Sequence, residues 1–228
     1  MAHEAAEKPQ RLSDIMPDGM FVGTSLILRQ GGRLVYGIRP PRTEGSRQII
    51  ELTGIGGGVE DEDESLVAGV LREAQEEIGC GVQLLPSPET IVVRSQDDVE
   101  RVALQGKERP AAVVFRHYRT PPHQPWHEDN QGEACLVVYL AELDGQPWPT
   151  MELPALIWLK PVHVVETAHR DVPLSKLLSS GAELVESELG LLPEQSWARM
   201  TDSQEALALA LGDDGLSFYR ALCSGALC

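Results

Sequence analysis

Residues 54–82 read GIGGGVEDEDESLVAGVLREAQEEIGCGV, and this stretch decides how the rest of the chain is interpreted. Its second half predicts a helix from about Glu64 to Ile78, with Gly79 suited to end it in a left-handed conformation. On a wheel of 3.6 residues per turn, the apolar residues share one arc that we expect to pack on the protein. That arc consists of Leu66, Val67, Val70, Leu71, Ala74 and Ile78.

A row of glutamates borders this arc. Glu73, Glu76 and Glu77 stand at positions i, i+3 and i+4, so their carboxylates share one flank of the helix. Most acidic flanks are simply solvated surfaces. A divalent cation would nevertheless use this one, because Mg²⁺ prefers oxygen ligands and keeps part of its shell for waters or phosphates. The glycines at 56–58 would let the backbone approach the same ion or a phosphate.

Nine positions of this stretch fit the pattern G-x5-E-x7-R-E-U-x-E-E-x-G-U, where U is apolar. They are Gly58, Glu64, Arg72, Glu73, Ala74, Glu76, Glu77, Gly79 and Cys80. The segment therefore resembles the Nudix box, and the resemblance covers about a tenth of the chain. It implies a Nudix hydrolase, whose fold is a mixed β-sheet sandwiched between helices. The strand pattern by itself indicates only an α/β or α+β protein.

The resemblance also implies roles for the box residues. Glu76 and Glu77 would be direct ligands of Mg²⁺ or Mn²⁺, Glu73 a ligand or the general base, and the carbonyl of Gly57 or Gly58 a further ligand. Arg72 would hold the acids in place through charged hydrogen bonds, with Glu64 as its partner.

Residues 120–133, TPPHQPWHEDNQGE, follow the box as a long loop in the region where Nudix enzymes often place a further acid. Glu133 is the first choice for this acid because it adjoins a predicted strand, and Glu128 and Asp129 are alternatives. Candidates for binding the substrate are Arg39, Arg94 and Arg116 near strand ends, and Trp126 as a surface on which a base could stack.

Charge and composition narrow the classes of partner. The 228 residues carry a net charge of −16, which disfavours nucleic-acid backbones and anionic membranes. A bound cation would reverse the local sign, so an anionic small molecule stays compatible. The four cysteines show no metal-binding spacing, and neither a secretion signal nor a membrane segment is evident. We therefore expect a cytoplasmic protein.

The distribution of apolar and polar residues divides the chain into three predicted segments. They are an arm or short docking helix over 1–18, a Nudix domain over 19–165 and a helical extension over 166–228. Strands are predicted at 20–29, 33–39, 48–52, 90–95, 111–119, 134–143 and 156–159. Helices are predicted at 173–180, 181–192, 202–211 and 217–222, and a long loop at 96–110.

The expected function is Mg²⁺-dependent hydrolysis of the pyrophosphate bond in a nucleoside diphosphate joined to another group, releasing a nucleoside monophosphate. A nucleotide sugar, an ADP-ribose-like molecule or a nucleoside triphosphate would fit. Residues 94–97 lack the Pro or Tyr of some subfamilies, and Thr53-Gly54-Ile55 replaces the usual Pro, so the substrate stays open. The alternatives are a nucleotide sensor without turnover and, less favoured, an isomerase of isoprenoid diphosphates. By family analogy we expect a homodimer.

Overall fold

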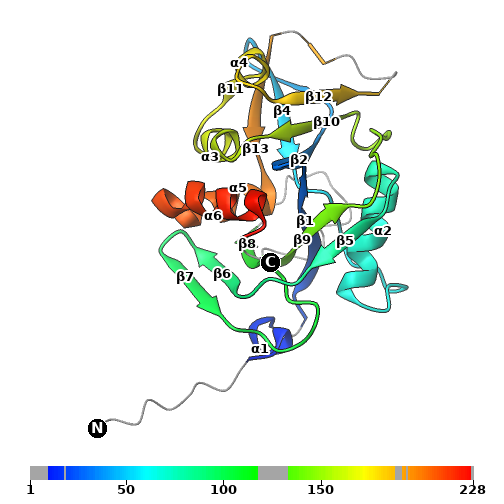
Figure 1. The fold of residues 1–228 in the computed structure, drawn as a ribbon, viewed down its shortest axis with the longest axis vertical. Helices are drawn as coiled ribbons and strands as arrows, with labels where there is room; N and C mark the ends of the chain where they lie inside the picture. The colour runs from blue at the N-terminus through cyan, green and yellow to red at the C-terminus, as the bar shows by residue number, and fades with distance from the viewer. Residues whose placement is uncertain (1–9, 18, 118–132, 188–191, 194, 227–228) are drawn as a thin grey trace.

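The structure, a computed structural model, describes residues 10–17, 19–117, 133–187, 192–193 and 195–226; the side chains of His117 and Glu133 lie outside the description. It is a mixed α+β fold in which helices lie against a large twisted sheet (Figure 1). This confirms the predicted fold class.

The described strands join one 13-stranded sheet with the order β11-β13-β4-β2-β1-β9-β8-β6-β7, and β10, β12, β3 and β5 pair off this path. Both parallel and antiparallel pairs occur, and the longest parallel pair joins β1 to β9. The strands are β1 (Phe21–Gln30), β2 (Arg33–Ile38), β3 (Arg42–Glu44), β4 (Arg47–Thr53), β5 (Val82–Leu85), β6 (Thr90–Ser95), β7 (Asp98–Val102), β8 (Ala112–His117), β9 (Glu133–Leu143), β10 (Ala155–Leu159), β11 (Val172–Pro173), β12 (Glu183–Glu186) and β13 (Ser196–Met200).

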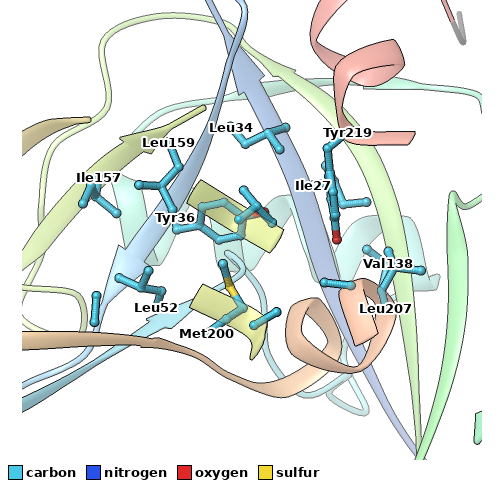
Figure 2. Packing of buried hydrophobic residues seen from close by; sticks show 14 of the residues in the cluster. Ile27, Leu34, Tyr36, Leu52, Val138, Ile157, Leu159, Met200, Leu207 and Tyr219 are labelled. Atoms are coloured by element: carbon cyan, nitrogen blue, oxygen red, sulfur yellow. The ribbon is translucent and has the colours of Figure 1, made fainter. Parts of the chain in front are cut away.

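Two apolar layers lie on opposite faces of the sheet. Alternate residues of a strand point to opposite faces, so Leu26 and Leu28 of β1 join one layer and Ile27 joins the other. The first layer is covered by α2 (Leu66–Ile78). The second is covered by α3 (Pro161–His169), α5 (Asp202–Leu211) and α6 (Gly215–Ser224), where Tyr219 and Leu207 meet sheet residues (Figure 2). The prediction of a sheet sandwiched between helices is thus confirmed.

The remaining helices are short: α1 (Leu12–Ile15), α4 (Leu174–Ser179) and the 3₁₀ turn η2 (Gly212–Asp214). Leu12 and Ile15 of α1 pack against the apolar layers, which matches a short docking helix rather than a loose arm at these residues. None of the described helices combines the length and the apolar character needed to cross a membrane.

The segment after residue 165 differs from the helical extension that we predicted. The helix expected at 181–192 is wrong, because residues 183–186 form β12 against β10. Strand β13 was not predicted and pairs in parallel with β4 over five residues, so this segment completes the sheet as well as covering it. The helix expected at 202–211 is confirmed as α5. The division at residue 165 itself stays a prediction.

The predicted loop at 96–110 is also wrong in part. Residues 98–102 form β7, which pairs with β6 in a hairpin. Charged residues occupy most of β7, and four of its five residues are exposed, so the apolar alternation that reveals a strand is missing.

Candidate metal and phosphate site

The helix α2 forms where local signals predicted it. Ser65 caps its first turn, with its Oγ accepting a hydrogen bond of 3.1 Å from the Ala68 N–H, and Gly79 ends it at a φ of 63°. Val70, Ala74 and Ile78 are fully buried, as the apolar arc required. Leu71 is 38% exposed, so its place on the packing face was predicted wrongly.

The glycine-rich loop before α2 is held along the first half of β1. The Thr24 N–H donates to the Gly57 carbonyl over 2.8 Å, the Leu26 N–H donates to the Ile55 carbonyl over 2.8 Å, and the Val59 N–H donates to the carbonyl of Val22 over 3.2 Å. These bonds fix the loop backbone on the central strand of the sheet. They place the loop next to the C-terminal half of α2.

Glu77 is the most buried of the three helix glutamates, with 8% of its surface exposed. Its Oε2 accepts a hydrogen bond of 2.7 Å from the Gly56 N–H. Burial is the main reason that the pKa of Glu77 rises to about 8; the charge of Glu73 adds to the rise, and the Gly56 hydrogen bond opposes it. Near neutral pH this carboxyl group therefore holds a proton, unless a cation compensates its charge.

Glu73 lies directly against the loop backbone. A Cβ on Gly57 would fall 2.5 Å from Glu73 Oε1, so only glycine leaves room for the carboxylate. Burial raises the pKa of Glu73 more than the neighbouring Arg72 lowers it, and the charge of Glu76 contributes to the rise. Two carboxyl groups with raised pKa values thus face one glycine loop.

Arg72 ties the acidic flank together. Its Nη1 donates to Glu73 Oε1 over 3.0 Å and to Glu76 Oε2 over 2.9 Å. Its Nη2 donates to the Gly58 carbonyl over 3.0 Å, and Nε and Nη2 donate to the two carboxylate oxygens of Asp63 over 3.2 and 3.1 Å. These hydrogen bonds are the main cause that raises the pKa of Arg72 and lowers that of Asp63.

The structural partner of Arg72 is therefore Asp63, and the prediction of Glu64 is wrong, since Glu64 is exposed and Arg72 has no described contact with it. Asp63 also accepts a 2.9 Å hydrogen bond from the Glu60 N–H, which holds the turn before the helix. A Cβ on Gly69 would lie 2.9 Å from Asp63 Oδ2, so the glycine inside α2 makes room for this carboxylate.

The described side chains form no group of three histidine, cysteine or acidic residues already arranged around a cation. Arg72 bridges Glu73 and Glu76, while Glu77 turns to the Gly56 amide. The three glutamates nevertheless suit a hard divalent cation, because they offer carboxylate oxygens. The raised pKa values of Glu73 and Glu77 show that nearby positive charge does not fully balance the negative charge of these two groups. The Gly57 carbonyl already accepts a hydrogen bond from Thr24 and keeps its second lone pair.

Of the predicted substrate arginines, Arg39 follows β2 directly, and its positive charge lowers the pKa of Glu77, although its side-chain partner is Asp202 of α5 at 3.3 Å. The described contacts of the other two lie elsewhere: Arg94 pairs with Glu100 on β7 at 3.2 Å, and Arg116 pairs with Glu205 on α5 at 3.4 Å.

Two further predictions cannot be compared with side chains. Trp126, together with Glu128 and Asp129, lies outside the described residues. Glu133 is placed by its backbone alone, as the first residue of β9.

Glu152 lies close enough to the glutamates of the site to affect them, and it was not predicted. Its negative charge contributes to the raised pKa of both Glu73 and Glu77. The loop that carries it is fixed to the end of α2, because Thr150 Oγ1 donates to the Glu77 carbonyl over 3.0 Å and the Trp148 N–H donates to the Ile78 carbonyl over 2.9 Å. No sequence signal pointed to this residue, since it is a single acid in a loop about 75 residues after the helix.

No family model matches the chain, and no curated protein matches it. Several solved structures are similar to it over part or most of the chain. The chain is similar to the ORF135 protein of E. coli, with 17% identity over 64% of this chain and 78% of that one and a TM-score of 0.39. A possible asymmetric diadenosine tetraphosphate hydrolase from Jonesia denitrificans matches with 14% identity over 87% and 95% of the two chains, at a TM-score of 0.44. A MutT NUDIX hydrolase from Burkholderia pseudomallei matches with 20% identity over 62% and 84%, at a TM-score of 0.36.

Proposed function

We propose that this protein is a Nudix-type pyrophosphohydrolase that uses Mg²⁺ or Mn²⁺ to cleave a nucleoside diphosphate derivative and release a nucleoside monophosphate. One observation carries the proposal: Glu73 and Glu77 are pressed against the backbone of Gly56 and Gly57, in positions that disfavour their own negative charge. Raised carboxyl pKa values of this kind cluster at functional sites.

In the proposed site Glu73, Glu76 and Glu77 hold the cation, with the Gly57 carbonyl as a further ligand. Arg72 need release only the two bonds made by its Nη1, because Nε and Nη2 stay fixed by Asp63 and the Gly58 carbonyl. When bound, divalent cations neutralise the charge of a diphosphate and make a water molecule more acidic.

The chain's own groups then orient the reaction. Glu73 is either a ligand of the cation or the general base, and its pKa lies above the ordinary value because the group is partly buried. Arg39 stands beside the ridge of glutamates with half of its side chain exposed, where it can contact a phosphate oxygen. Glu133 stays a candidate for the general base. The identity of the substrate, the homodimer and the cytoplasmic location remain predictions.

The test is a screen of nucleotide sugars, ADP-ribose, dinucleoside polyphosphates and nucleoside triphosphates with Mg²⁺ in ¹⁸O-labelled water, with products resolved by mass. We expect a labelled phosphate product from one of these classes and no reaction with a chelator present. Glu77→Gln should reduce kcat by at least about 100-fold, whereas Glu62→Gln, an exposed acid on the loop before α2, should leave it unchanged. Binding of a nucleotide without turnover would instead support the sensor.

A further inference from the structure

One described residue other than glycine adopts a backbone conformation that L-amino acids avoid. Asp202, the first residue of α5, has a φ of 57°, and it is the only described non-glycine residue with a positive φ. Such strained residues persist where the surrounding structure enforces them, and they concentrate at functional sites. The strain at Asp202 therefore calls for a physical reason.

The surroundings of Asp202 are built by the end of β4. Thr201, the preceding residue, donates from its N–H to the Leu52 carbonyl over 3.0 Å and from its Oγ1 to the same carbonyl over 3.2 Å. These two bonds fix the start of α5 beside Thr53, which leads directly into the glycine loop. The backbone at Asp202 is thus held to the strand that ends at the proposed site.

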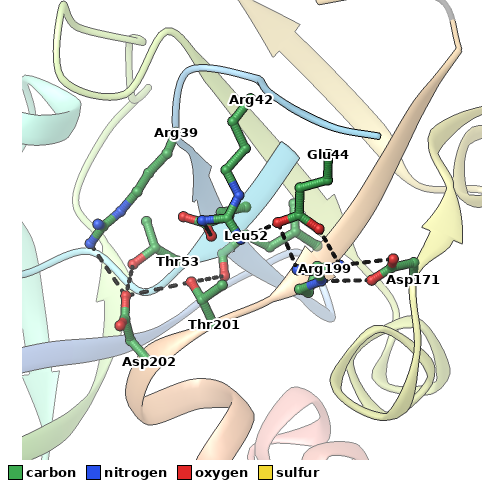
Figure 3. Close-up of polar contacts among 10 residues, drawn as sticks. Arg39, Arg42, Glu44, Leu52, Thr53, Asp171, Arg199, Thr201 and Asp202 are labelled. Atoms are coloured by element: carbon green, nitrogen blue, oxygen red, sulfur yellow. Dashed lines mark hydrogen bonds and ion pairs between the residues drawn. The ribbon is translucent and has the colours of Figure 1, made fainter. Parts of the chain in front are cut away.

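Oδ2 of Asp202 accepts a hydrogen bond from Arg39 Nη2 over 3.3 Å (Figure 3). The hydroxyl groups of Thr201 and Thr53 lie 3.4 and 3.5 Å from the same oxygen, and each has a nearer carbonyl acceptor at 3.2 Å, that of Leu52 and that of Gly54. Arg39 donates its backbone N–H to the Glu51 carbonyl over 3.0 Å, so both ends of this arginine are tied to β4 and α5. The carboxylate of Asp202 is therefore the group that directs the guanidinium.

The position of Arg39 links this network to the acidic ridge. Gly37 pairs with Thr53 across the antiparallel β2–β4 ladder, so the Arg39 backbone lies opposite Glu51, two residues before β4 ends. Its side chain reaches Asp202 Oδ2, the oxygen that also lies 3.5 Å from Thr53 Oγ1 at the end of β4. Three residues after Thr53, the Gly56 N–H holds Glu77 over 2.7 Å. The side chain of Arg39 is half exposed and is therefore accessible to the phosphates that the proposed function places at the glycine loop.

We propose that Asp202 is a positioning residue that holds Arg39 in place to receive the phosphate of the substrate. Asp202 does not touch the substrate itself. The inference rests on the proposed function for the identity of the anion, and on the strained backbone and the Arg39–Asp202 ion pair for the role of Asp202. The α5 helix then serves the site as well as covering the sheet.

The test compares Asp202→Asn and Asp202→Gly with wild type, with Asp171→Asn as the matched control. Asp171 also pairs with an arginine, Arg199 at 2.7 Å, but has no described contact with the loop or with Arg39. We expect both Asp202 variants to raise KM about fivefold with kcat changed less than about twofold. Asp202→Gly relieves the backbone strain, so its Tm should equal or exceed that of wild type while its KM still rises.

A double-mutant cycle separates positioning from a direct contact. In an Arg39→Ala background, Asp202→Asn should have almost no further effect on KM, because its action passes through the arginine. Full additivity of the two changes, or an unchanged KM in both Asp202 variants, would overturn the proposal. A fall in Tm with an unchanged KM would assign Asp202 a purely structural role and would overturn it as well.

Binding is measured separately from turnover by titrating inorganic pyrophosphate with Mg²⁺ into each full-length protein. If wild type binds pyrophosphate but no nucleotide is cleaved, the proposed function fails; a fivefold weaker affinity of Asp202→Asn would still support the positioning role. If wild type binds no pyrophosphate, Arg39 has no phosphate to receive and this inference fails.

Discussion

Two arginines of this protein, Arg72 and Arg199, each gather several carboxylates, and the acids around them behave differently. Arg199 grips two acids in a bidentate manner, Asp171 over 2.7 and 3.0 Å and Glu44 over 3.2 and 3.1 Å (Figure 3). The pKa of both acids falls below its ordinary value, mainly because of these hydrogen bonds. Arg199 thus connects β13 to β3 and to the residue before β11, and both of its acids are fully paired.

The Arg72 cluster satisfies only one of its acids. Asp63 is gripped by two N–H groups, whereas Glu73 and Glu76 share the single atom Nη1, and Glu77 has no described contact with the arginine. The pKa of Glu73 and of Glu77 is raised. In the Arg199 cluster each acid receives two arginine N–H groups, whereas in the Arg72 cluster Glu73 and Glu76 receive one each and Glu77 none, which marks the Arg72 cluster as the candidate site.

Replacing each arginine by methionine should separate the two clusters most strongly. Arg72→Met should reduce kcat/KM about 100-fold, because the acidic ridge loses the group that arranges it. Arg199→Met should leave kcat unchanged and reduce the free energy of unfolding by about 1 kcal/mol. Steady-state kinetics and urea unfolding measure the two effects. An equal loss of activity in Arg72→Met and Arg199→Met would contradict the view that only the Arg72 cluster serves the reaction.

The affinity for Mg²⁺ should depend on pH through Glu77. Its pKa of about 8 means that a cation must displace a proton below this pH. Between pH 6 and 8 we expect the dissociation constant of Mg²⁺ to fall by up to about tenfold per pH unit. Calorimetry in buffers of different ionisation enthalpy would count the released protons. Asp171→Asn should follow the wild-type curve, and a pH-independent affinity would contradict the role of Glu77.

Stability without metal should depend on pH in opposite directions at the two clusters. The folded protein keeps the Glu77 proton up to a pKa of about 8, whereas the ordinary value is 4.5. Between these values the folded state binds more protons than the unfolded state, so stability falls as pH rises, by at most about 1.4 kcal/mol per pH unit. Glu77→Gln should abolish this loss and exceed wild type in stability at pH 8.5.

The lowered pKa of Asp171 has the reverse sign. Its contribution is present above the unfolded pKa and is lost as pH falls through the folded pKa, so Asp171→Asn should be less stable than wild type at pH 7 and equal to it in strong acid. Thermal unfolding of both variants across pH measures this. If the stability of Glu77→Gln and of Asp171→Asn changed with pH in the same direction relative to wild type, the two clusters would not have pKa shifts of opposite sign.

The smallest expected effect is at Glu152. Its charge adds to the raised pKa of Glu73 and Glu77, so Glu152→Gln should slightly lower the pH at which Mg²⁺ binding is half complete. If Glu152 also attracts the cation, the half-saturating Mg²⁺ concentration at pH 8.5 should rise about threefold. An activity titration with Mg²⁺ resolves this, and Glu183→Gln, an acid paired with Arg33, is the control.

The sequence predicted the parts of the site that depend on short-range order. The helix α2, its cap and the row of glutamates follow from residue spacing, and the buried strands follow from runs of apolar residues. Strand β13 could not be found in this way, because SWARM alternates weakly and its partner β4 lies about 150 residues earlier. Its pairing depends on the whole sheet.

The contacts between segments were equally out of reach. The spacing of the motif does not say which acid reaches Arg72, and the adjacent residue Asp63 has the geometry that Glu64 lacks. The positions of Glu152 and Asp202 depend on the tertiary fold. Glu152 is on the loop that Thr150 ties to the end of α2, and Asp202 contacts Arg39 from the start of α5.

The parallel pairing of β13 with β4 has a consequence for synthesis of the protein. The glutamate ridge lies on α2, but the neighbour of β4 and the helices over the second apolar layer are translated later, after residue 160. While the ribosome is still making residues 196–224, one side of β4 and the apolar face near Leu52 are open to other chains. A nascent protein paused before this point should therefore be sensitive to aggregation, because its sheet is still incomplete.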